Sequence, residues 1–139
     1  MKITICGSMT FYREMREVKD GLVVLGHEVL LPVEAENDTI PVEARSDISD
    51  EAKISAKIEY DFIREHFRKI EDSDAVLILN YEKKNITGYI GGNTFLEMGH
   101  AFGLGKKIFL MYPVPRMDYL TEMHAMQPVV IDGDLTKIS

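Results

Sequence analysis

Glu97 is the residue whose type and position best suit covalent chemistry. It follows two adjacent glycines, Gly91 and Gly92, which allow a backbone to approach a ligand closely. The spacing places the glutamate in the first turn of a helix, where the helix dipole favours an ionised carboxylate. An ionised and firmly held glutamate is what a carboxylate nucleophile requires. The segment from Thr94 to Glu97 also fits a capping box, in which the glutamate only fixes the helix start, so spacing alone leaves both roles open.

A second candidate site is the loop at residues 6–10. Gly7, Ser8 and Thr10 provide a glycine and two hydroxyls ahead of a helix start. Such a loop suits an anion or a sugar hydroxyl, because the first turn of a helix leaves backbone N–H groups free. The alternative is a tight turn in which Thr10 only caps the helix. The chain contains neither a P-loop nor a Gly-x-Gly-x-x-Gly dinucleotide pattern.

The remaining reactive side chains predict neither a metal nor a cofactor. Four histidines share no metal-ligand spacing with one another or with the single cysteine: His27, His66, His100 and His124. One cysteine allows no intrachain disulfide and argues against a cysteine-built metal site. Cys6 ends an apolar segment, so we expect it to be buried and inert, with a catalytic role as the alternative. His100 lies one turn after Glu97, and we expect it to serve packing.

Helical patterns alternate with short apolar segments along the whole chain. The first helix is expected from Phe11, because apolar residues recur there at intervals of four and three residues until Gly26 ends the pattern. A second begins at 49–51, and its expected inward positions include Ile58, Phe62, Phe67 and Ile70. Further helices are expected to run from the Gly91–Gly92 pair to about 104 and over 117–126. Polar loops are expected at 33–48 and 80–89.

Five apolar segments predict the sheet: 2–6, 27–32, 75–79, 107–112 and 128–131. They are continuously apolar, which is typical of parallel strands buried on both faces. We therefore expect an α/β fold with a single doubly wound five-stranded parallel sheet, in the flavodoxin-like or Rossmann-like order 2-1-3-4-5. Ligands bind such a sheet beyond the carboxyl ends of its strands. The candidate substrate-binding residues in the loops there are Cys6, Gly7, Ser8, Met9, Asn80, Gly91, Gly92 and Asn93.

Length and charge limit the class of protein. A chain of 139 residues matches one domain, 1–139, and a formal net charge of −7 argues against binding a nucleic-acid polymer. The longest apolar runs are far shorter than a membrane span. Met1 and Lys2 lead directly into a strand pattern with no signal peptide, so we expect a soluble cytoplasmic protein without a membrane partner.

Several segments together resemble the nucleoside 2-deoxyribosyltransferase superfamily, and within it the 2′-deoxynucleoside 5′-phosphate N-hydrolase branch. The resemblance covers about residues 1–131 and rests on Cys6-Gly-Ser8, Ser73-Asp74-Ala-Val-Leu, Glu97-Met-Gly-His-Ala and Gly105-Lys-Lys-Ile. It implies that Glu97 attacks the anomeric carbon of a deoxyribose and displaces the base. Water or a second base then resolves the glycosyl-enzyme, as in retaining glycoside hydrolysis.

The same resemblance implies further roles. The Gly7–Ser8 loop matches the loop that contacts the sugar and, in the phosphate-dependent branch, the 5′-phosphate. Thr121 matches a hydroxyl that a neighbouring subunit lends to the phosphate site, so a homodimer or a dimer of dimers is expected. The apolar residues Met117, Leu120, Met123 and Met126 favour an interface there, and the alternative is that they cover the edge of the sheet.

Two positions depart from the family pattern. His66 stands where the family has a second carboxylate, and we expect it to act with Glu97 by donating a proton to the leaving base. Gly91 stands where the family has Asp or Ser, which leaves backbone N–H groups to hold a phosphate. These departures keep two alternatives open: a non-catalytic nucleotide-binding or sensing module, and a cytokinin-type phosphoribohydrolase. The chain lacks the full Pro-Gly-Gly-x-Gly-Thr-x-x-Glu signature of the latter.

Overall fold

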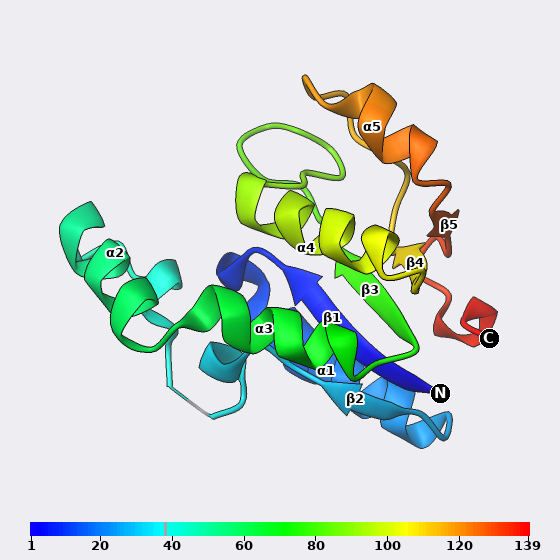
Figure 1. The fold of residues 1–139 in the computed structure, drawn as a ribbon, viewed down its shortest axis with the longest axis horizontal. Coiled ribbons are helices and arrows are strands. Elements are labelled where there is room, and N and C mark those ends of the chain that lie inside the picture. Colours follow the sequence, from blue (N-terminus) through cyan, green and yellow to red (C-terminus); the bar gives the residue numbers. More distant parts are fainter. Residues whose placement is uncertain (38) are drawn as a thin grey trace.

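The computed structural model describes residues 1–37 and 39–139 and contains one five-stranded parallel sheet with helices on both faces (Figure 1). The strands are β1 (Lys2–Gly7), β2 (Glu28–Leu30), β3 (Ala75–Leu79), β4 (Lys107–Leu110) and β5 (Val129–Val130). Their order, β2-β1-β3-β4-β5, confirms the predicted topology, and every pair of neighbours is parallel. The strand order therefore reverses between β1 and β3, so the loops after these two strands diverge at one edge of the sheet.

Within the described residues, five α-helices and three short 3₁₀ turns lie between the strands, and a fourth 3₁₀ turn follows β5. The helices are α1 (Tyr12–Val24), α2 (Asp50–Glu59), α3 (Phe62–Glu71), α4 (Gly92–Gly103) and α5 (Leu120–Ala125). The 3₁₀ turns are η1 (Met9–Phe11), η2 (Val33–Ala35), η3 (Val42–Ala44) and η4 (Leu135–Lys137). Within the described part of the chain, no helix has the length and apolar character needed to cross a membrane.

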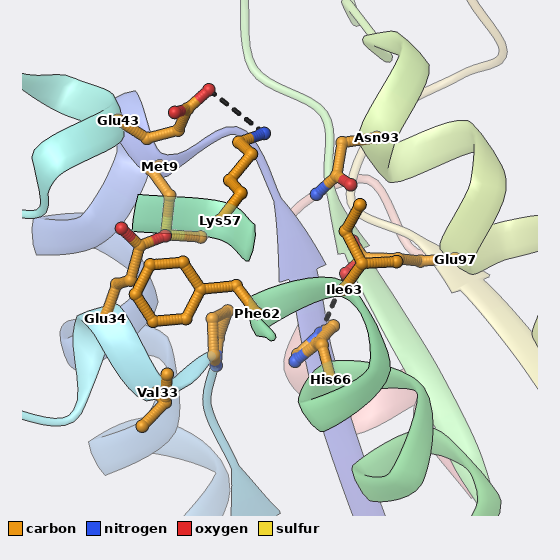
Figure 2. A pocket seen from close by; sticks show the side chains of 11 residues that line it. Met9, Val33, Glu34, Glu43, Lys57, Phe62, Ile63, His66, Asn93 and Glu97 are labelled. Carbon is orange, nitrogen blue, oxygen red and sulfur yellow. Dashed lines mark ion pairs between the residues drawn. The ribbon is translucent and has the colours of Figure 1, made fainter. Parts of the chain in front are cut away.

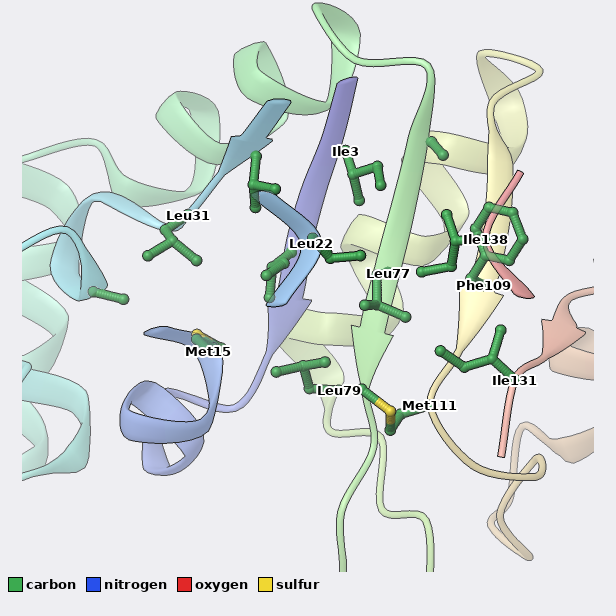
Figure 3. Close-up of a cluster of buried hydrophobic side chains, with 14 of the residues drawn as sticks. Ile3, Met15, Leu22, Leu31, Leu77, Leu79, Phe109, Met111, Ile131 and Ile138 are labelled. Carbon is green, nitrogen blue, oxygen red and sulfur yellow. The ribbon is translucent and has the colours of Figure 1, made fainter. Parts of the chain in front are cut away.

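The alternation of side chains along β1 divides the core into two layers. Ile3 and Ile5 belong to the layer that includes Leu22 of α1 (Figure 3). Cys6 belongs to the other layer, with Ile70 of α3 and Met98 of α4. Each large apolar side chain removed from water contributes about 1.5–3 kcal/mol to stability. A shift of β1 by one residue would move its side chains to the opposite faces of the sheet and disrupt the packing of both layers. The side chain of Cys6 is thereby directed toward α3 and α4.

The single helix expected from 49 to 70 is instead two helices, and that expectation is wrong. The break lies at Asp61, whose left-handed backbone (φ 50°, ψ 42°) ends the regular hydrogen-bonding pattern. Ile58 is 75% exposed, so it is not an inward residue. Because α3 starts anew at Phe62, its buried face carries His66 and Ile70, which lie four residues apart.

Helix α4 begins earlier than the capping-box interpretation requires, and that interpretation is wrong. Gly91 is the residue before the helix, with an extended backbone, and Gly92 is the first helical residue. Thr94 therefore lies inside the first turn and cannot cap it with its side chain. Glu97 lies in the second turn, where it is buried together with Met98.

Helix α5 packs on its own chain. It is shorter than expected, and Met123 is fully buried in the layer that contains α4. Met117 and Met126 are partly buried against the same layer, which confirms that these residues cover the sheet. Met117, Leu120 and Met126 keep part of their surface exposed, so these contacts do not decide for or against an interface at this helix, and the dimer stays a prediction. The C-terminal Leu135 and Ile138, which the strand pattern did not include, cover the opposite layer.

Asn80 joins the ends of β3 and β4 and leaves no polar atom of its side chain free for a ligand. Its amide nitrogen donates to the carbonyls of Tyr112 (2.8 Å) and Pro113 (3.2 Å), and its amide oxygen accepts from the Tyr112 N–H (2.9 Å). The side chain is fully buried. We therefore assign Asn80 a structural role, which corrects its prediction as a substrate-binding residue.

Replacing Asn80 by alanine is expected to lower the free energy of unfolding by about 2–5 kcal/mol, because three partly buried backbone groups lose their hydrogen-bond partner. Urea denaturation measures this change. Glu82→Gln, an exposed change in the following loop, serves as the control and is expected to have no effect. Unchanged stability of the alanine variant would contradict the structural role.

Candidate active site

Three buried side chains from three elements meet beside the sheet: Cys6 of β1, His66 of α3 and Glu97 of α4. The Nε2 atom of His66 lies 3.4 Å from Cys6 Sγ and 3.4 Å from Glu97 Oε2. All three residues are at most 4% exposed. The two residues predicted to be catalytic, His66 and Glu97, are thus adjacent, although their positions in the chain are far apart.

The packing of α3 on α4 sets this geometry. The ring of Phe67 stacks on that of His100, with 4.3 Å between the centroids, and His100 Nε2 lies 3.2 Å from a carboxylate oxygen of Glu71. These contacts join α3 and α4 close to the cluster, because Phe67 directly follows His66 and His100 lies one turn after Glu97. They confirm the expected packing role of His100.

Burial raises the pKa of Glu97 to about 8, and the charge of Lys57 opposes the rise only in part. The carboxyl group is therefore largely protonated at neutral pH, which corrects the expectation that the helix dipole keeps it ionised. The physical reason is position: the dipole acts within the first turn, and Glu97 lies beyond it in an apolar layer.

His66 is held neutral. Burial, aided by the charge of Lys69, lowers the pKa of its imidazole to about 3. An imidazolium that could protonate a leaving base is therefore scarce at neutral pH, so the expected acid role does not suit this environment. The Nε2 atom of the neutral ring faces both Cys6 Sγ and Glu97 Oε2, while Nδ1 lacks a hydrogen-bond partner among the described residues.

Cys6 is a protonated thiol at the base of this cluster. Burial, together with the charge of Glu97, raises its pKa well above the ordinary value, which agrees with the inert role expected for it. Its sulfur and the Glu97 carboxyl face the same nitrogen of His66. A nucleophile–histidine–acid relay uses both ring nitrogens, so this arrangement is not such a triad.

A cavity of about 40 Å³ opens over His66 and Glu97 (Figure 2). Lys57 of α2 reaches across it, and its ammonium lies 3.2 Å from the carboxylate of Glu43. Asn93 of α4 lines the same cavity. Neither Lys57 nor Glu43 was singled out by the sequence, because both lie in a stretch whose path over the sheet no local pattern shows.

A second hollow of about 170 Å³ adjoins the first and shares four lining residues with it: Met9, Glu43, Lys57 and Asn93.

The other residues that line the second hollow include four that were predicted to bind substrate: Gly7, Ser8, Gly91 and Gly92. A Cβ atom at Gly92 would meet nothing within 4 Å, so the backbone at the start of α4 faces open space. The two hollows together form the candidate active site.

The second hollow has the groups that bind an anion. The ammonium of Lys83 donates to the hydroxyl of Ser8 at 2.7 Å, and α4 begins in the hollow's wall with free backbone N–H groups. Burial, together with the neighbouring Lys84, lowers the pKa of Lys83. Lys83 was missed by sequence reasoning, although two lysines after a buried strand in an acidic chain were a usable signal.

Besides Asn80, two other predicted site residues lie outside both hollows: Cys6 and Thr121. Cys6 contacts His66 beneath the first cavity but is not among its described lining residues. Thr121 is exposed on α5, and its hydroxyl donates to the adjacent Glu122 carboxylate at 3.0 Å. Its role across a dimer interface stays a prediction.

Comparison with known proteins shows the fold. No protein-family model matches the chain, and neither does a curated protein sequence. The structure is similar to that of a 2-deoxyribosyltransferase from the psychrotolerant bacterium Bacillus psychrosaccharolyticus, with a TM-score of 0.51 and 19% identity over 79% of this chain and 71% of that one. A Clostridium botulinum CMP N-glycosidase gives a TM-score of 0.46 at 15% identity, over 94% of this chain and 85% of that one. The first likeness shows a shared fold at low identity.

The buried carboxyl makes stability depend on pH in a defined direction. Between pH 6.5 and 8 the folded chain keeps the Glu97 proton that the unfolded chain has lost, so stability falls as pH rises. The lowered pKa of His66 affects stability mainly below about pH 6.5 and in the opposite direction, since there the unfolded chain takes up a proton that the folded chain does not. We expect a decrease of up to about 2 kcal/mol across this window, measured by urea denaturation.

The control is Glu97→Gln, which cannot titrate. The difference in unfolding free energy between the variant and the wild type is expected to change with pH over the same window. A constant difference would show that the Glu97 carboxyl has an ordinary pKa.

Proposed function

We propose that the protein is an N-glycosidase or deoxyribosyltransferase, which cleaves the base–sugar bond of a (deoxy)nucleoside or its 5′-monophosphate with Glu97 as the nucleophile. One observation carries the proposal: a buried glutamate and an anion-binding hollow lie in adjoining parts of one cleft. The sequence resemblance around Glu97 and the fold shared with a 2-deoxyribosyltransferase support the same reaction class.

The anion-binding hollow holds the 5′-phosphate in this proposal. The Lys83 ammonium, the Ser8 hydroxyl and the backbone N–H groups at the start of α4 donate to its oxygens. Glu43 lines the same hollow, but its carboxylate is paired with Lys57. The sugar then lies between the phosphate and the cavity that contains Glu97, which places the anomeric carbon toward the carboxylate.

The reaction begins with the ionised form of Glu97. One carboxylate oxygen forms a bond to the anomeric carbon while the bond to the base breaks, and the base leaves with that electron pair and gains a proton from solvent. Water, or a second base, then attacks the same carbon and releases the glutamate. The site thus needs the carboxylate ionised at the moment of attack.

Two neighbouring side chains favour that ionised form. The positive charge of Lys57 lowers the pKa of Glu97 against the effect of burial. The neutral ring of His66 has Nε2 at 3.4 Å from the carboxyl oxygen, where an Nε2–H group donates once the proton has left. His66 is in this role a positioning residue that orients the nucleophile.

The same geometry favours a second candidate, a nucleotide-binding module without turnover. The observation behind it is the pKa of about 8, which leaves most of the Glu97 carboxyl protonated at neutral pH. The two functions differ in one measurement, the release of free base from a panel of nucleosides and nucleoside monophosphates at pH 8.5. Saturable binding with no base released under these conditions would identify the binding module.

Glu97→Gln is expected to abolish base release, by about 10³-fold or more, because the uncharged amide cannot form the ester intermediate. Nucleotide affinity is expected to remain close to that of the wild type. In the wild type, kcat/KM is expected to rise with pH toward a plateau above about 8, since the ionised carboxylate attacks. Chromatography of the released base measures the turnover of the variant and the pH dependence of kcat/KM.

The matched control is Glu17→Gln, an exposed change on α1. Its turnover and pH profile are expected to equal those of the wild type. Turnover at the wild-type rate in the Glu97 variant would rule out the nucleophile.

Lys83→Met keeps the length of the side chain and removes its charge. We expect nucleoside monophosphates to bind the wild type more tightly than the parent nucleosides, and this preference to shrink by about tenfold in the variant, which corresponds to about 1.4 kcal/mol. Isothermal titration calorimetry of both ligand forms measures the preference. Lys84→Met, in the same loop and exposed, is the control. Equal affinity of the wild type for both forms would exclude the phosphate site.

A further inference from the structure

We propose that Cys6, His66 and Glu97 form a binding site for one Zn²⁺ ion at the base of the cavity. The sulfur, nitrogen and oxygen atoms of these side chains lie within 4.8 Å of one another, and all three residues are buried. The sequence predicted no metal, because Cys6 and His66 are 60 residues apart and Glu97 comes from a third element. The site therefore exists only in the folded chain.

The distances match the edges of a tetrahedral zinc site. Zinc binds sulfur at about 2.3 Å and nitrogen or oxygen at about 2.0–2.2 Å, so a tetrahedral site separates S from N by about 3.5 Å and N from O by about 3.4 Å. The observed separations are 3.4 Å in both cases. The third edge, between the Cys6 sulfur and the Glu97 carboxyl, lies within 4.8 Å and shortens on binding.

A metal ion also resolves a conflict in the hydrogen bonding. The thiol and the carboxyl both face Nε2 of His66, but a neutral ring nitrogen makes one good hydrogen bond at a time. A cation placed between the three atoms accepts a lone pair from each of them. The thiol and carboxyl protons leave to solvent when the metal binds.

Charge balance favours a divalent ion in this apolar layer. One thiolate and one carboxylate neutralise Zn²⁺, so no net charge is buried. The surrounding side chains include Ile70, Val76 and Met98, which exclude water and strengthen the interaction of the ion with its ligands. A thiolate and an imidazole favour zinc over magnesium or calcium.

The cavity supplies the fourth position of the tetrahedron. His66 and Glu97 line it, and its volume of about 40 Å³ holds a water molecule. The ion thus lies where Glu97 would attack a substrate. If the proposed function holds, bound Zn²⁺ occupies the nucleophile and inhibits base release reversibly; this consequence rests on the proposed function, whereas the metal site does not.

The test uses the whole chain, stripped of metal by dialysis against a chelator. Titration with Co²⁺ is expected to show one equivalent bound, with a thiolate-to-cobalt charge-transfer band and the intense visible bands of tetrahedral Co²⁺. Zn²⁺ is expected to displace the Co²⁺, and a hundredfold excess of Mg²⁺ is not. Absence of the charge-transfer band in the wild type would overturn the proposal without the need for any variant.

Variants identify the ligands. Cys6→Ser and His66→Gln are each expected to weaken Zn²⁺ binding by about 100-fold or more, with folding checked by circular dichroism. His124→Gln, an exposed histidine on α5, is the matched control and is expected to bind Zn²⁺ as the wild type does. Folded Cys6→Ser protein with wild-type affinity would overturn the proposed site.

Activity separates the two proposals. Inhibition of base release at one equivalent of Zn²⁺, reversed by a chelator, supports both. Metal binding by a chain that releases no base supports the metal site and overturns the proposed reaction. Base release by a chain that binds no Zn²⁺ supports the reaction and overturns the metal site. Undiminished base release with one Zn²⁺ bound would overturn the proposed metal site, because an ion held by Glu97 would block the nucleophile.

Discussion

The exclusion of water between the sheet and helices α3 and α4 sets the chemistry of this protein. The layer is apolar, and its side chains include Ile70, Val76 and Met98. Two titratable groups in it, the carboxyl of Glu97 and the imidazole of His66, are both driven toward their neutral forms, one by a raised and the other by a lowered pKa. Desolvation is the largest cause in both cases, because either charged form loses its hydration. The proposed nucleophile and the proposed metal ligands are all buried in this one layer, so the same desolvation acts on each of them.

The two adjoining hollows differ in the polarity of their surroundings. The inner cavity opens over Glu97, whose surroundings are mostly apolar, whereas the outer hollow presents Lys83, Ser8 and the start of α4. A chain with a net charge of −7 needs such a local concentration of donors if it is to hold an anion. Lys57 links the two parts, since it lines both and its charge acts on Glu97. Under the proposed function, the phosphate lies in the outer hollow and the Glu97 carboxyl in the inner cavity beside it.

The break at Asp61 gives the cleft its outer wall. Helix α2 projects from the body of the molecule (Figure 1), and its side chains are exposed or half-buried along its whole length. Its start is capped by the Ser49 hydroxyl, and the ion pair between Lys57 and Glu43 ties it to η3. A continuous helix over 49–70 would keep a single direction. Because the chain turns at Asp61 instead, Lys57 of α2 and His66 of α3 line the same cavity.

The sequence by itself determined the sheet order and the loops that carry Gly7, Ser8, Gly91 and Gly92. Continuous apolar runs and helical periodicity are local properties, and parallel strands necessarily bring their carboxyl ends to one edge. The sequence also singled out Glu97, but it did not show that burial would raise the pKa of this carboxyl. Only the tertiary structure decided that burial raises the pKa of Glu97 to about 8 and lowers that of His66 to about 3, that Asn80 binds backbone groups and that Cys6 completes a three-residue cluster. The reason is physical: desolvation and convergence depend on neighbours in space, and these neighbours come from β1, α3 and α4, which are far apart along the chain.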